Sequence, residues 1–220
     1  TYLESPDVLI NLSWPDIPNY TTKKHLKTSY YQKRLNKNLI SNGLDNIIFL
    51  GTCFEYGKKN GIVSEKSKAN PTIPYSIAKL DVLKNLIKLK KKRQFKFSWL
   101  RPFYVYGKNK KRKTLYTIIN DLNQVGGTLK LNGSLVRDFV PVEFLCKSIV
   151  KITLMNKNFG ILNICTGKGI SIQNFIKKNI KNKNNLKKIN MKGKISNYFE
   201  SEYFWGNPNK LKKILNFKKN

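Results

Sequence analysis

A tyrosine and a lysine four residues apart, Tyr75 and Lys79, are the residues of this sequence best suited to chemistry. Residues at this spacing share one face of a helix, so the phenol and the ammonium would point the same way. A neighbouring cation favours the phenolate, so we expect Lys79 to lower the pKa of Tyr75 from its ordinary value near ~10. Such a phenol is the general acid or base that interconversion of a carbonyl and an alcohol needs. A hydroxyl from another element would complete the site, and Thr52 is the candidate.

The spacing alone also has an ordinary explanation. A tyrosine and a lysine four residues apart recur by chance in lysine-rich chains, where they form a weak surface pair. The secondary structure predicted around Tyr75 and Lys79 therefore has to distinguish a solvated surface pair from a catalytic site.

These elements alternate between strand and helix. Four short apolar runs predict buried strands at residues 8–13, 47–52, 97–101 and 162–165. Apolar periodicity predicts helices at residues 22–42, 75–92, 114–124, 142–155, 171–181 and 208–215, and Gly43 would end the first. The alternation predicts a parallel sheet covered on both faces, with ligands bound beyond the carboxyl ends of the strands. Thr52 ends one of these strands, where a site residue is expected.

The composition is strongly basic. The 220 residues include 43 Lys and Arg against 12 Asp and Glu, a net charge of +31 that attracts phosphates, nucleic acid and acidic surfaces. The lysines occur in every segment, however, and no zinc-finger spacing, RNP-like aromatic block or basic zipper is present. We therefore interpret them as solvated surface residues and expect no nucleic-acid partner. A basic nucleic-acid-binding protein is the alternative.

Cysteine and histidine usage argues against several kinds of site. Cys53, Cys146 and Cys165 have no paired spacing, so neither a disulfide framework nor a zinc site is predicted. The single histidine, His25, argues against multi-histidine metal sites and a Ser-His-Asp mechanism. No apolar stretch reaches the roughly 18 residues that span a bilayer. We expect no metal, no membrane partner and a cytoplasmic location.

Four blocks of sequence, in a fixed order, carry a family resemblance. They are GTCFEYG at 51–57, PYSIAK at 74–79, LRPFYVYG at 100–107 and RDFVPVE at 137–143. Together they resemble the NAD-dependent epimerase/dehydratase family, the extended short-chain dehydrogenases/reductases that modify nucleotide sugars, over about residues 7–217. The resemblance implies an α/β fold: a Rossmann-like doubly wound parallel sheet with a smaller C-terminal substrate-binding lobe. It also implies NAD or NADP as cofactor, a nucleotide-diphosphate sugar as substrate and, since many relatives pair, a homodimer.

The resemblance assigns catalytic and cofactor-binding roles by position. Thr52 matches the Ser/Thr that orients the substrate oxygen, Tyr75 matches the acid/base, and Lys79 matches the lysine that also holds the nicotinamide ribose. The cofactor would further contact residues at the ends of two other strands. These are Leu12 and Ser13 after the first run, and Pro102 and Phe103 after the third.

Arg137 and Tyr104 are matched to the substrate side. Arg137 looks like the arginine that binds the diphosphate, a role that suits a forked and permanently charged donor. An ion pair with Asp138 or Glu143 is its structural alternative. Tyr104 stands where many relatives have a substrate-contacting Asn, so that contact differs here.

Cys53 and Phe54 complete the predicted substrate contacts and limit the reaction. They stand where the dehydratases of the family have Asp and Glu, so we expect no dehydration. The residues in the first and last blocks resemble those of a subgroup associated with surface-polysaccharide deoxysugars. We therefore expect an NAD(P)-dependent enzyme that reduces a 4-keto group or epimerises an NDP-(deoxy)hexose. Reductase or epimerase, NAD or NADP, and the sugar itself stay open, and a non-catalytic relative is a further alternative.

The sequence has no glycine-rich turn between a strand and a helix, the feature that cradles a dinucleotide pyrophosphate. In the family this turn follows the first strand, and the run at residues 8–13 looks like the fourth. We therefore expect that the first βα units, roughly 60 residues, are missing and that the fragment is inactive alone. We expect residues 1–108 to form a partial NAD(P)-binding domain with the catalytic Tyr and Lys. Residues 109–220 would form mainly the substrate-binding lobe, with some segments returning to the sheet.

Overall fold

Four parallel strands form the centre of the molecule. The computed structural model describes residues 6–108, 114–124, 129–181, 184, 189–190, 192 and 199–215. The strands lie in the order β1 (Val8–Asn11), β2 (Asn46–Leu50), β4 (Lys96–Pro102) and β9 (Gly160–Ile164), and every neighbouring pair is parallel. Their carboxyl ends therefore meet at one edge of the sheet, which is where side chains from different strands can converge.

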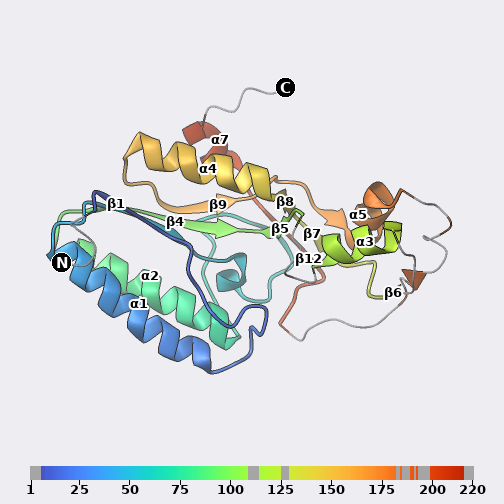
Figure 1. The fold of residues 1–220 in the computed structure, drawn as a ribbon, viewed down its shortest axis with the longest axis horizontal. Helices are drawn as coiled ribbons and strands as arrows, with labels where there is room; N and C mark the ends of the chain where they lie inside the picture. The colour runs from blue at the N-terminus through green and yellow to red at the C-terminus, as the bar shows by residue number, and fades with distance from the viewer. Residues whose placement is uncertain are drawn as a thin grey trace.

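Helices cover both faces of this sheet (Figure 1). On one face lie α1 (Lys24–Ser41) and α2 (Pro74–Lys90), and on the other lie α4 (Val142–Met155) and α7 (Asn209–Leu215). α1 ends just before Gly43, whose φ of 96° is a left-handed conformation that glycine adopts without strain. α2 begins with Pro74 in its first turn, where the missing N–H has no intrahelical partner to lose.

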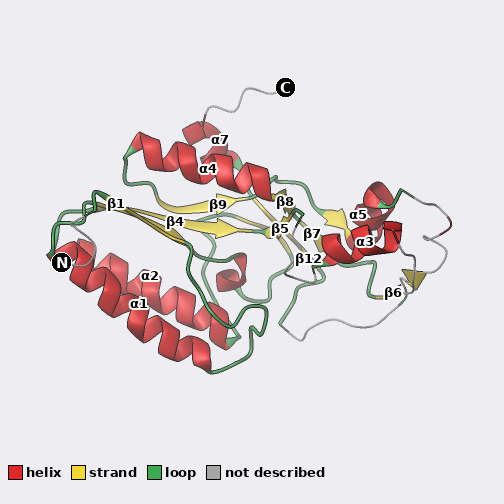
Figure 2. Cartoon of the chain, in the orientation of Figure 1, coloured by secondary structure: helices red, strands yellow, loops and turns green. Residues whose placement is uncertain are grey.

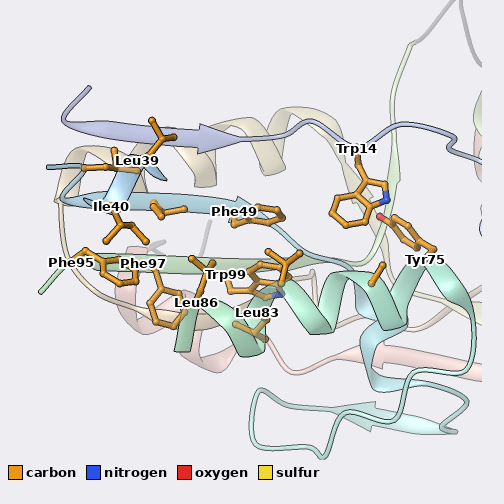
Figure 3. Close-up of a cluster of buried hydrophobic side chains, with 14 of the residues drawn as sticks. Trp14, Leu39, Ile40, Phe49, Tyr75, Leu83, Leu86, Phe95, Phe97 and Trp99 are labelled. Atoms are coloured by element: carbon orange, nitrogen blue, oxygen red, sulfur yellow. The ribbon is translucent and has the colours of Figure 1, made fainter. Parts of the chain in front are cut away.

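The alternation of side chains along each strand supplies a core to both faces. On β2, Ile47 and Phe49 pack towards α1 and α2, whereas Ile48 packs in the cluster that contains side chains of α4. On the first face the rings of Phe49 and Trp99 are stacked, with centroids 4.6 Å apart (Figure 3). This cluster runs along α2 up to Tyr75, so the same packing that forms the core also fixes the start of that helix.

A smaller lobe lies beyond the carboxyl ends of the strands (Figure 2). Its core packs α3 (Leu115–Gln124) against α5 (Ile172–Asn179), and the rings of Phe139 and Phe175 are stacked at 3.8 Å. Two strands, β5 (Tyr104–Tyr106) and β8 (Phe139–Pro141), pair in parallel. Four others form a sheet in the order β10 (Ile170–Ser171), β7 (Val136–Arg137), β12 (Tyr203–Gly206) and β3 (Gly61–Val63). The remaining described elements are η1 (Cys53–Tyr56), β6 (Leu129–Lys130) and β11 (Ile189–Asn190).

The predicted fold class is confirmed: a doubly wound parallel α/β sheet with a smaller C-terminal lobe. The four predicted strands and six predicted helices are all present, with ends that differ by at most two residues. The short strands of the lobe and the 3-10 helix η1 were not predicted, because segments of two to four residues carry no periodicity to detect. α4, β9 and α7 follow residue 109 in sequence yet pack on the main sheet.

The described residues contain neither a membrane-spanning helix nor a cluster of metal ligands. No helix there combines the length and the apolar character needed to cross a membrane. No group of three or more His, Cys, Asp or Glu side chains there could hold a metal ion.

Candidate active site

Thr52 lies at the carboxyl end of β2 and begins the short helix η1. Its backbone is extended, its hydroxyl accepts a hydrogen bond from the amide of Phe54 at 3.3 Å, and its own amide donates to Glu55 Oε1 at 2.9 Å. These two bonds form a capping box, in which a side chain at each end of the turn satisfies a backbone amide. The hydroxyl of Thr52 is therefore held in place by local hydrogen bonds.

Tyr75 and Lys79 come from the first turns of α2 and meet Thr52 there. Both are buried, and the side chains of Thr52 and Tyr75 lie close enough for an interaction that lowers the pKa of the phenol. The Lys79 ammonium donates to the carbonyl of Leu50 at 2.6 Å and lies 5.9 Å from the centroid of the Tyr75 ring. The structure thus brings together the three residues that were predicted from a strand end and a helix face.

The predicted effect of Lys79 on the Tyr75 phenol is wrong for this structure. Burial raises the pKa of Tyr75, the neighbouring Tyr20 raises it further, and the interaction with the Thr52 side chain only partly opposes them. Burial also lowers the pKa of Lys79 to about 7, against an opposing contribution from Glu55. The ammonium is directed at Leu50 O and at an aromatic ring, so it does little to stabilise a phenolate, and desolvation decides both shifts.

An aromatic segment between β1 and α1 covers this site. The ring of Tyr20 lies 5.2 Å from that of Tyr75, and the Lys79 ammonium lies 4.0 Å from the centroid of the Trp14 ring. Trp14 Nε1 donates to His25 Nδ1 at 3.1 Å, so the indole is held in position. Figure 3 shows Trp14 and Tyr75 together at one end of the core cluster. Neither Trp14 nor Tyr20 was predicted to lie at the site, although Trp14 follows a predicted strand end.

Glu55 is a buried residue whose carboxylate bonds to the Thr52 amide, and it was also not predicted to lie at the site. Its oxygens accept hydrogen bonds from Trp99 Nε1 at 2.9 Å and from Arg101 Nε at 2.9 Å, in addition to the Thr52 amide. Burial raises the pKa of Glu55, and Arg101, Trp99 and the Thr52 amide oppose that shift. Glu55 and Arg101 form an ion pair in which both side chains are at most 2% exposed.

The residues predicted to lie along a cofactor differ in their exposure. Leu12 and Ser13 follow β1 and are exposed, and the Ser13 amide donates to Asn11 Oδ1 at 3.2 Å. Pro102 ends β4 and is half-buried, whereas Phe103 is buried and stacks on Phe204 with centroids 5.2 Å apart. The exposed side chain of Leu12 at this edge of the sheet fits the apolar face of a nicotinamide, whereas the Lys79 amine expected to hold the ribose is only 3% exposed and donates to Leu50 O. The ring of Phe103, in contrast, packs inside the protein.

The predicted substrate-side residues form a continuous cluster next to Thr52. Cys53 is buried, and burial raises the pKa of its thiol. The ring of Phe54 lies edge-on to that of Tyr104, with centroids 6.0 Å apart. The guanidinium of Arg137 lies 5.1 Å from the centroid of the Tyr104 ring. The cluster therefore extends from the catalytic candidates to the predicted diphosphate-binding arginine.

Arg137 is only 1% exposed and pairs with Glu200, an acid that was not among its predicted partners. Its Nη2 donates to Glu200 Oε2 at 2.6 Å, and its Nη1 donates to the Val136 carbonyl at 2.8 Å. The alternative partner Asp138 instead accepts bonds from the amide and hydroxyl of Thr166. A partner 63 residues away in sequence cannot be found from local spacing.

Comparison with known proteins identifies the family. The model of the NAD dependent epimerase/dehydratase family matches residues 2–165, and the chain belongs to that family. The chain is 26% identical over 174 residues to the dTDP-6-deoxy-L-talose 4-dehydrogenase (NAD(+)) of Aggregatibacter actinomycetemcomitans. That match covers 78% of this chain and 64% of the relative, so the chain spans less than two thirds of the length of this curated relative.

Solved structures share the fold at low sequence identity. The NAD-dependent NDP-hexosamine 5,6-dehydratase TunA superimposes over 100% of this chain and 73% of its own, with a TM-score of 0.85 at 16% identity. The UDP-glucuronic acid 4-epimerase from Bacillus cereus, in complex with NAD, superimposes over 100% of this chain and 71% of its own, with a TM-score of 0.79 at 22% identity. At these identities the comparison establishes the Rossmann-type fold.

Proposed function

We propose that this protein is an NAD(P)-dependent nucleotide-sugar oxidoreductase or epimerase, which reduces a 4-keto group or inverts a ring carbon of an NDP-(deoxy)hexose. One observation carries the proposal: Thr52, Tyr75 and Lys79 lie together at the carboxyl ends of the parallel strands, where the Thr52 side chain interacts with Tyr75 and the Lys79 ammonium lies 5.9 Å from the centroid of the Tyr75 ring. The relatives named above act on nucleotide sugars, which supports this substrate class. A role in surface polysaccharide synthesis is part of the same proposal.

The nicotinamide cofactor, NAD or NADP, would supply or accept the hydride. Leu12, Ser13 and Pro102 would lie along it, and the Lys79 amine would donate to its ribose. Phe103 would contribute as the buried support of the turn that follows β4, because its ring stacks on Phe204.

Tyr75 would transfer the hydroxyl proton of the sugar, and Thr52 would hold the same oxygen. The raised pKa of Tyr75 keeps the phenol protonated near neutral pH, which suits donation of a proton to a carbonyl oxygen. The interaction of the Thr52 side chain with Tyr75 brings both hydroxyls near one point, so one substrate oxygen can accept a hydrogen bond from each. The arrangement therefore polarises the carbonyl and delivers the proton from the same side.

The diphosphate of the substrate would lie at Arg137, beside Tyr104 and Phe54. Cys53 and Phe54 carry no carboxylate, so we propose that the enzyme does not eliminate water. We further propose that residues 109–220 form mainly the substrate-binding lobe, with some segments returning to the main sheet, while residues 1–108 carry the catalytic and cofactor-binding groups.

Thr52 offers a matched pair of variants that tests this function. The full-length protein should oxidise or reduce a nicotinamide cofactor, or invert a sugar, with at least one member of a panel of UDP- and dTDP-sugars. Thr52→Val keeps the shape but removes the donor, so it should lower kcat/KM by about 10²–10³-fold. Thr52→Ser keeps the hydroxyl and should retain most of the activity. Equal activity of the two variants would remove Thr52 from the mechanism, and inactivity of the wild-type protein on the whole panel would reject the substrate class.

A further inference from the structure

We propose that Glu55 is a positioning residue of the active site: its buried carboxylate fixes the backbone of Thr52 and places a negative charge near the Lys79 ammonium. This inference rests on the proposed function, because it assigns a task to the residues that surround the reacting oxygen. Glu55 touches neither Tyr75 nor Lys79 through a hydrogen bond described in the structure, so it would act through Thr52 and through its charge.

The hydrogen bonds of Glu55 indicate an ionised carboxylate. The side chain is fully buried, and each bond it makes is accepted from a donor: the Thr52 amide, the Trp99 indole and the Arg101 guanidinium. Bonds to a charged acceptor are about twice as strong as neutral ones, and the low dielectric of the interior strengthens them further. The carboxylate thus ties the end of β2 and the start of η1 to β4.

Gly51 is required for this connection. A Cβ atom at position 51 would lie 2.2 Å from Trp99 Nε1 and 2.5 Å from Glu55 Oε1, too close for either atom. The bond between Glu55 and Trp99 therefore passes directly over the residue before Thr52, and only glycine leaves room for it. The turn that presents the Thr52 hydroxyl therefore depends on the Glu55 carboxylate. A helix cap alone would need only the bond to the Thr52 amide, and the bond to Trp99 adds a second constraint.

The second task of Glu55 concerns the charge on Lys79. The ammonium is 3% exposed and is surrounded by uncharged groups from three elements: Trp14 before α1, Phe49 on β2 and Tyr75 on its own helix. Of the charged groups near the site, Arg101 on β4 is paired with Glu55, and Glu55 on η1 is the one whose charge raises the pKa of Lys79. Without this charge the lysine would lose its proton at a lower pH.

Two variants separate the two tasks. Glu55→Gln alone would leave Arg101 buried without its partner, which can unfold a protein, so the first variant is the double substitution Glu55→Gln with Arg101→Met. It removes both charges and should keep the thermal stability close to wild type. We expect kcat to fall about 10- to 100-fold, and the alkaline limb of the pH profile of kcat/KM to move to lower pH. The second variant, Glu55→Asp, keeps the charge but shortens the side chain, so kcat should fall while the alkaline limb stays in place.

The result that would overturn the inference is a folded double variant with wild-type kcat and an unchanged pH profile, since Glu55 would then only stabilise the fold. An alkaline limb that moves equally in Glu55→Asp and in the double variant would also overturn it, because the retained charge would have no effect. The proposed function is judged separately by Tyr75→Phe. If that variant is inactive and the Glu55 variants behave as wild type, the positioning role fails and the proposed function stands.

Discussion

Replacing Tyr75 with phenylalanine should lower kcat by about 10²–10⁴-fold and leave the binding of the nucleotide sugar nearly unchanged. The substitution removes the one oxygen that can transfer the proton and keeps the ring, which packs against Trp14 and Tyr20. The fold should therefore survive. Steady-state kinetics of the full-length protein gives kcat, and calorimetric titration of the sugar nucleotide gives its Kd.

Tyr20→Phe is the matched control for this prediction. Tyr20 lies 5.2 Å from Tyr75, ring to ring, so its substitution removes a hydroxyl from the same region. It should retain most of the activity. Loss of activity in Tyr20→Phe but not in Tyr75→Phe would show that Tyr20, and not Tyr75, transfers the proton. Full activity in both variants would reject the acid/base proposal.

Replacing Lys79 with methionine should abolish turnover and at the same time stabilise the fold. The lysine is 3% exposed, and burial lowers its pKa from an ordinary 10.5 to about 7. Methionine has a similar length and no charge to desolvate. Below pH 7 the gain in the free energy of unfolding should be on the order of 2–4 kcal/mol, after allowance for the lost contacts with Leu50 and Trp14.

The pH dependence of this gain follows from the direction of the shift. Because the folded state holds the Lys79 proton less tightly than the unfolded state, wild-type stability rises with pH between about 7 and 10.5. The methionine variant lacks this proton, so its advantage should be fully present below pH 7 and should decline as pH rises towards 10.5. Denaturant unfolding at several pH values measures it.

Lys88→Met provides the control for the stability measurement. Lys88 lies on the same helix and is exposed, so removal of its charge should produce no comparable gain at low pH. If Lys79→Met is no more stable than Lys88→Met below pH 7, the lysine of the site is not desolvated in the way described here.

Much of the fold could be predicted from local patterns. The strand run that contains Ile47 and Phe49 is apolar because it is buried on both faces, and the apolar spacing from Ala78 to Leu86 follows the buried face of α2. Thr52 could be placed because strand ends in a parallel sheet meet at one edge. These features depend on neighbours in sequence.

What could not be predicted depends on partners distant in sequence. Glu55 looks like any charged residue in a loop until Trp99 and Arg101, 44 and 46 residues later, are placed beside it. The pKa of Tyr75 was expected to fall because its helical neighbour is a cation. Burial, which is set by Trp14, Tyr20 and the core, moves it in the opposite direction.

The transfer of deuterium from the reactive carbon of a labelled nicotinamide to a ring carbon of the sugar tests the central claim most directly. The full-length protein, supplied with the labelled cofactor and a 4-keto nucleotide sugar, should yield a product with deuterium on one ring carbon, as detected by mass spectrometry. The same experiment with Tyr75→Phe should yield almost none. If the wild-type protein binds both ligands and transfers no deuterium, or if the variant transfers it equally well, Thr52, Tyr75 and Lys79 do not form the catalytic site proposed here.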